Sequence, residues 1–128
     1  MQKVRVLPVI FLLLSVVACA TFTQNTYRTL YTAGTSYDMA MTTVSTLQKA
    51  NYINSTQRNE INQLADYFYV AYQSSVTAFE AYKRSSTSDN KAKVTTALLS
   101  VFSRWRDLAS YVNRLRPNTL PPELEEVK

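Results

Sequence analysis

The most regular apolar pattern of the chain lies between residues 90 and 116. Apolar side chains recur there at alternating intervals of four and three residues: Val94, Leu98, Val101, Trp105, Leu108, Val112 and Leu115. Because an α-helix turns once every 3.6 residues, this spacing places them all on one face of a helix. Ser88 or Asp89 is expected to cap its start. Pro117 is expected to end it at Arg116, since the residue before a proline avoids the α conformation.

Two earlier segments show the same kind of spacing. Residues 26–49 carry Leu30, Ala33, Tyr37, Ala40, Val44 and Leu47, and residues 56–84 carry Ile61, Leu64, Phe68, Tyr72, Val76 and Phe79. We expect both segments to be helices, with Asn54 or Ser55 as the N-cap of the second. Gly34 lies inside the first helix, where glycine costs about 1 kcal/mol relative to alanine. We interpret it as a point of close approach by a neighbouring helix, with a kink or a later start of the helix as the alternatives.

These three segments define the expected fold. The chain has one glycine and four prolines, too few turn residues for an all-β fold. Helices of similar length joined by short connections pack against their neighbours in antiparallel fashion. The sequence therefore predicts an all-α protein, an up-down-up three-helix bundle over residues 26–116, with Trp105 level with Phe68 and Ala40. A coiled-coil oligomer is the alternative. The second segment drifts from a period of 3.5 towards 3.6, which favours the monomeric bundle.

The N-terminal 19 residues have the layout of an export signal. Lys3 and Arg5 form a basic head, residues 6–17 are almost all apolar, and Ala18 is a small residue before Cys19. The apolar run is shorter than the roughly 20 residues that span a bilayer. Residues 1–18 are therefore expected to be a cleaved signal peptide.

The sequence Val16-Val17-Ala18-Cys19 resembles the lipobox of bacterial lipoproteins. The resemblance implies cleavage after Ala18 and lipid acylation of Cys19, with an ordinary cleaved signal as the alternative. Ala20 resembles the pattern that sorts lipoproteins to the outer membrane, which in a Gram-negative cell implies its periplasmic face. Residues 19–25 are then expected to be a short lipidated tether, which reaches about 20 Å when fully extended.

Basic residues surround the expected turn between the second and third helices. Lys83, Arg84, Lys91 and Lys93 lie there, against Glu80 and Asp89. In an up-down-up bundle this turn lies at the same end as Cys19. We therefore expect the four basic residues to face anionic headgroups, at about 1 kcal/mol each. The alternative is a solvated charge run in which Glu80 pairs with Arg84.

Two further surfaces are candidates for a partner. Tyr67 and Val70 point away from the apolar face of their helix, and exposed aromatic rings favour interfaces. The alternative is that such flanking tyrosines only bring their hydroxyl groups to water. The Pro/Glu-rich tail, residues 117–128, is not helical at Pro121-Pro122 and is expected to be an extended arm, with terminal disorder as the alternative.

The composition argues against two classes of function, catalysis and nucleic-acid binding. The chain has no histidine and one cysteine, so the usual general base and metal ligand are missing, and no catalytic site is expected. The formal charge of +5 falls to about +3 once Lys3 and Arg5 are removed, too little for a nucleic-acid binder.

The sequence is therefore interpreted as a membrane-anchored lipoprotein that works without catalysis, as a binding or structural module. Its partners are expected to be membrane lipid and an envelope protein or the cell wall, with no cofactor beyond the covalent lipid on Cys19. The overall pattern is similar to small bacterial or prophage-encoded lipoproteins. A prophage-type superinfection-exclusion lipoprotein and a carrier of an apolar ligand remain alternatives.

Overall fold

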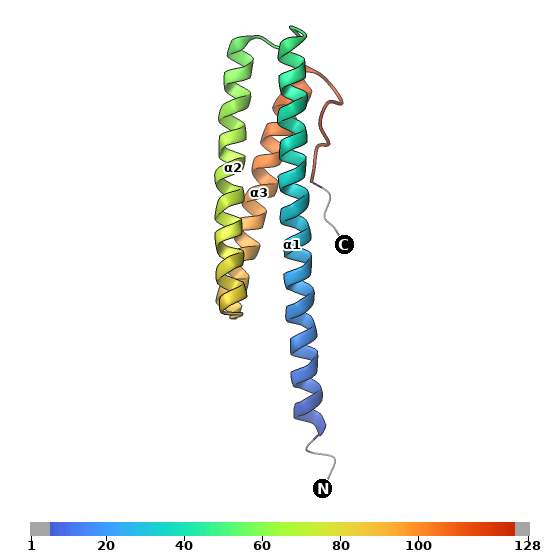
Figure 1. Ribbon diagram of the computed structural model, residues 1–128, viewed down its shortest axis with the longest axis vertical. Coiled ribbons are helices and arrows are strands. Elements are labelled where there is room, and N and C mark those ends of the chain that lie inside the picture. Colours follow the sequence, from blue (N-terminus) through green and yellow to red (C-terminus); the bar gives the residue numbers. More distant parts are fainter. Residues whose placement is uncertain (1–5, 125–128) are drawn as a thin grey trace.

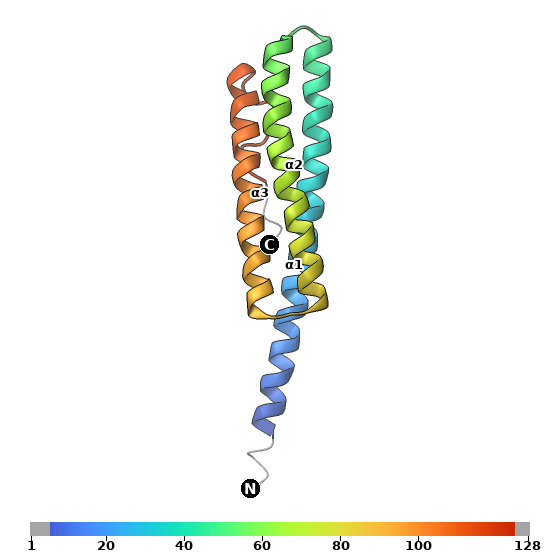
Figure 2. The ribbon, with the colours of Figure 1, turned by 90° about the vertical axis from the view of Figure 1, so that its left-hand side faces the viewer.

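The computed structural model describes the backbone of residues 6–124 and the side chains of residues 19–124. Within that range the chain is all-α, with α1 (Val6–Lys49), α2 (Ser55–Arg84) and α3 (Ser88–Leu115). Sequential helices run antiparallel and side by side, so the described chain forms the expected three-helix bundle (Figures 1 and 2). The basic head of the expected signal, residues 1–5, lies outside the described residues.

The first helix is longer than expected. Residues 19–25, expected to be a tether before a helix that starts at residue 26, are helical and belong to α1 without a break. Two residues hold this part of α1 against the bundle, and the prediction of a tether overlooked them. The ring of Phe22 packs on that of Tyr82, and Thr26 is buried. No glycine or proline interrupts this stretch. Figure 1 shows α1 projecting well beyond the turn between α2 and α3.

Side chains from the preceding turns cap the other two helices. Asn54, one of the two expected candidates, caps α2 in a reciprocal capping box with Gln57. The cap of α3 is Thr87, and not Ser88 or Asp89 as expected. The Thr87 hydroxyl accepts a hydrogen bond from the backbone N–H of Asn90 at 3.1 Å. Which of these adjacent residues becomes the cap depends on where the backbone enters the helix. The spacing of apolar residues fixes that point only to within a residue or two.

The core contains the expected layer of large and small residues. The rings of Phe68 and Trp105 meet edge to face at 5.7 Å between centroids, and Ala40 belongs to the same buried cluster. Gly34 is the predicted point of close approach, because a Cβ there would lie 3.1 Å from the hydroxyl oxygen of Tyr72. Small residues on α1 thus make room for aromatic rings on α2 and α3.

The tail does not form the free arm that was expected. The described part, residues 117–124, folds back along the bundle beside α1 (Figure 1). Leu120 and Leu124 are buried in one cluster with side chains of α1 and α3. The backbones of α1 and α3 approach each other less than those of α2 and α3. The tail therefore fills part of the seam between α1 and α3.

One side chain on α3 fixes the start of this tail. The amide group of Asn113 accepts from the backbone N–H groups of Thr119 and Leu120 and donates to the carbonyl oxygen of Leu120, at 2.9–3.0 Å. Asn118 has a φ of 60°, the left-handed conformation that asparagine tolerates well. Glu125 and Glu126, the last acidic residues of the expected arm, lie outside the described residues.

Candidate functional site

Cys19 lies at the end of the bundle where α2 turns into α3, which we call the basal end. It is exposed, and its side chain is within hydrogen-bonding reach of the Tyr82 hydroxyl. One turn along α1, the ring of Phe22 meets that of Tyr82 at 4.9 Å and an interplanar angle of 75°. Burial, followed by the hydrogen bond with Cys19, raises the pKa of Tyr82. The residue of the predicted acylation is therefore in direct contact with the packed bundle.

The four basic residues singled out in the sequence lie around this end, and we call them the basal cluster: Lys83, Arg84, Lys91 and Lys93. All four side chains are exposed. The Nζ atom of Lys91 lies 4.9 Å from the centroid of the Phe22 ring, and that of Lys83 lies 5.1 Å from the Phe79 ring. The structure thus brings Lys91 next to the helix turn that carries Cys19.

The pair between Glu80 and Arg84, which belonged to the alternative of a solvated charge run, is not the one that forms. Glu80 instead pairs with Lys83, one residue nearer, at 2.8 Å. Both spacings are sterically available on a helix, and the i,i+3 partner is the one chosen here. Among the described residues, no ion pair is formed by the other three members of the basal cluster.

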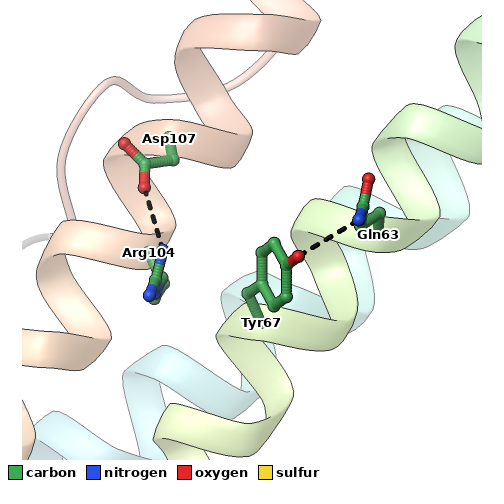
Figure 3. Close-up of polar contacts among 4 residues, drawn as sticks. All are labelled: Gln63, Tyr67, Arg104 and Asp107. Atoms are coloured by element: carbon green, nitrogen blue, oxygen red, sulfur yellow. Dashed lines mark hydrogen bonds and ion pairs between the residues drawn. The ribbon is translucent and has the colours of Figure 1, made fainter.

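Tyr67 and Val70 both point outward as expected, with exposures of 45% and 64%. They belong to different surroundings. The hydroxyl of Tyr67 accepts from the side-chain amide of Gln63 at 3.1 Å, and its ring lies 5.2 Å from the guanidinium of Arg104. Figure 3 shows Tyr67 between Gln63 on its own helix and the ion pair of Arg104 with Asp107 on α3.

Val70 instead borders a shallow hollow on the outer side of α2. The hollow has a volume of about 570 Å³, and its lining is shared by α2 and the first turns of α3, including Lys93. Tyr69, with about half of its surface exposed, stands at its edge. The single patch that the sequence suggested is therefore two adjacent surfaces, one polar and one apolar.

A second polar contact between α2 and α3 continues the surface of Tyr67. The hydroxyl of Tyr111 donates a short hydrogen bond to the carboxylate of Glu60, and Arg114 lies 5.5 Å from the Tyr111 ring. The hydrogen bond to Glu60, followed by burial, raises the pKa of Tyr111. We call this surface the α2–α3 strip: Glu60, Gln63, Tyr67, Arg104, Asp107, Tyr111 and Arg114. Its tyrosine and arginine side chains are of the types that dominate binding energy at protein interfaces.

The strip was only partly visible in the sequence. Tyr67 stood out because it lies off the apolar face, but Arg104, which lies over its ring, comes from α3 and is far away along the chain. Tyr111 fell on the flank of the apolar face of α3, where helical position alone does not distinguish a core residue from a surface one. Alignment of two helices in the correct register was needed to bring Glu60 and Tyr111 together.

Comparison with protein-family models, with curated proteins and with solved structures gave no match to this chain. Within the described range, no helix combines the length and the apolar character that a bilayer crossing requires. The same residues contain no group of three or more metal-ligating side chains close enough together to hold an ion.

Proposed function

We propose that the protein is a lipoprotein of the bacterial cell envelope, acylated on Cys19, whose helical bundle serves as a binding or structural module without catalysis. The observation that carries the proposal is the position of Cys19. It follows the lipobox-like residues Val16-Val17-Ala18 and lies exposed at one extreme end of the bundle. An acyl chain attached there can enter a bilayer without disturbing the core.

Anchoring follows from the energetics of hydrocarbon burial. Each CH₂ group contributes about 0.8 kcal/mol, so a single chain holds marginally and two or three hold durably. With the lipid at the basal end, the α2–α3 strip faces sideways from the anchor. We propose this strip as the surface for an envelope protein or a cell-wall component. Ala20 after the acylated residue supports the periplasmic face of the outer membrane as the location in a Gram-negative cell.

A packed core supports a binding module over an apolar carrier. The layer of Ala40, Phe68 and Trp105 is buried and tightly interleaved. The hollow beside Val70 is lined largely by exposed residues, and so is a second hollow of about 450 Å³ beside Tyr111 on the α2–α3 strip. A carrier would need an enclosed apolar cavity of several hundred Å³.

Acylation is tested by mass spectrometry of the N-terminal peptide after expression of the full chain in a Gram-negative host. We expect a peptide that begins at Cys19 and carries the mass of two or three acyl chains, and release of the protein from membranes only by detergent. Cys19→Ser should abolish both, and the matched variant Ala20→Ser should keep the lipid. A bare thiol at Cys19 would overturn the proposal.

The binding surface is tested with a photo-crosslinking residue at position 67 and, as the matched control, at position 99. Leu99 is 63% exposed on α3 and lines a hollow shared with α1, away from the α2–α3 strip. We expect one discrete crosslinked species from position 67, none from position 99, and loss of the species when Arg104 is changed to alanine. Equal crosslinking from both positions would contradict a specific surface on the strip.

A further inference from the structure

We propose that the basal end is a docking surface for the anionic phospholipid headgroups around the anchor, and that it holds the bundle directly on the bilayer. The inference rests on the proposed acylation of Cys19 and adds to it a second contact with the same membrane. Three features of the described residues carry it.

The first feature is the shortness of the link between lipid and bundle. The ring of Phe22 packs on Tyr82 and Thr26 is buried, so α1 is fixed to the bundle from its fourth residue after the proposed cleavage site. The sequence Thr21-Phe22-Thr23-Gln24 fits a capping box, which would restart the helix once residues 1–18 are removed. The link between the lipid and the packed part of α1 is then no longer than Cys19–Thr21, or about 10 Å even when fully extended.

The second feature is the charge at this end. The basal cluster contributes four positive charges, and Glu80 and Asp89 contribute two negative ones. Glu80 is already paired with Lys83, whereas Arg84, Lys91 and Lys93 form no ion pair among the described residues. A surface with unpaired cations within a Debye length of an anionic leaflet is attracted to it.

The third feature is that the cations are held next to the anchor. Lys91 lies over the ring of Phe22, three residues from Cys19. Tyr82, which contacts the Cys19 side chain, is followed directly by Lys83 and Arg84. Headgroups that surround an acylated Cys19 therefore lie within reach of both ends of the α2–α3 turn. A short link and a charged base together restrict the tilt of the bundle.

The test uses the mature, lipidated protein reconstituted into vesicles of phosphatidylcholine alone or with about a third of phosphatidylglycerol. Backbone hydrogen exchange of residues 82–93 is measured in both. We expect exchange to be at least about threefold slower in the anionic vesicles. The difference should disappear in about 1 M salt, where the Debye length is about 3 Å.

Two variants with the same loss of charge separate docking from general attraction. The basal variant carries Lys83→Gln, Arg84→Gln, Lys91→Gln and Lys93→Gln. The control variant carries Lys49→Gln, Arg58→Gln, Arg106→Gln and Arg116→Gln, which lie outside both the basal cluster and the α2–α3 strip. The slower hydrogen exchange in anionic vesicles should be lost in the basal variant and kept in the control variant. Circular dichroism checks that both variants keep their helical content.

The outcomes distinguish this inference from the proposed function. If Cys19 is acylated and the vesicles retain the protein, but exchange is the same in both lipid compositions, the docking surface is refuted and the anchor stands. Loss of slowing in both variants alike also refutes it. A bare Cys19 together with no retention by either kind of vesicle refutes both.

Discussion

The indole N–H of Trp105 donates to the backbone carbonyl oxygen of Pro121, with 3.1 Å between nitrogen and oxygen. This bond joins the centre of α3 to the tail that follows it. Because a buried indole needs a hydrogen-bond partner, the tail satisfies the one polar atom of the largest core side chain. The tail is in this respect part of the core, and its loss should change the environment of the Trp105 side chain.

Leu120→Ala tests the contribution of the tail to stability. Leu120 is 7% exposed, and truncation of a buried leucine costs about 2–4 kcal/mol. Leu99→Ala, at an exposed position of α3, should change the free energy of unfolding by less than about 0.5 kcal/mol. Urea unfolding followed by circular dichroism measures both. Because Trp105 is the single tryptophan, its emission should also shift to longer wavelength in the Leu120 variant only. Equal effects of the two substitutions would show that the tail is not docked.

Gly34→Ala separates helix propensity from packing. Alanine is favoured over glycine by about 1 kcal/mol in a helix interior. The new Cβ would lie 3.1 Å from the Tyr72 hydroxyl oxygen, so that ring must move by a few tenths of an ångström. Tyr72 is only partly buried and can shift, and we therefore expect net stabilisation of about 0.5 kcal/mol.

The close contact itself is tested in a Tyr72→Phe background, which removes the hydroxyl oxygen. There Gly34→Ala should stabilise by about the full 1 kcal/mol, as measured by thermal or urea unfolding. A destabilisation of the same size in both backgrounds would mean that the backbone of α2, and not the Tyr72 hydroxyl, limits the approach of α1.

Asn54→Ala should weaken the start of α2. The Asn54 side chain accepts a hydrogen bond from the backbone N–H of Gln57 at 2.8 Å, and loss of such a cap typically costs about 1 kcal/mol. Ser55→Ala, at the next residue, is the matched control and should cost less than about 0.5 kcal/mol. Unfolding in urea distinguishes the two. The reverse order of effects would place the cap at Ser55.

The fold was largely predictable because the apolar spacing of all three helices is regular. Register could also be predicted in part: the antiparallel order placed Phe68 level with Trp105, and the two rings are in contact. The tail could not be predicted in this way. Its contacts depend on Asn113 and Trp105 presenting single polar atoms to backbone groups, and such bonds leave no periodic signal in a sequence.

The candidate site was predictable where it depended on chain position and not where it depended on pairing. Cys19 and the basal cluster share one end of the bundle because the topology requires it. The helical residues 19–25 were missed because threonine is a weak helix former, and the packing of Phe22 on Tyr82 overrides that preference. The contact between Tyr67 and Arg104 was missed because Arg104 approaches the ring from another helix.

Alkaline pH should destabilise the fold through Tyr111. The hydrogen bond to Glu60, followed by burial, raises the pKa of Tyr111 above its ordinary value of 10.0. The folded protein therefore holds this proton more tightly than the unfolded chain. The resulting stability is fully present below pH 10.0 and is lost as the pH rises through the higher pKa of the folded state.

The free energy of unfolding, measured by urea titration on both sides of this pH, should fall less steeply in Tyr111→Phe and in Glu60→Gln than in the parent. Tyr27→Phe, which removes an exposed hydroxyl on α1 at the other end of the bundle, should leave the slope as in the parent. A slope unchanged by Tyr111→Phe would show that the bond between α2 and α3 does not form in solution.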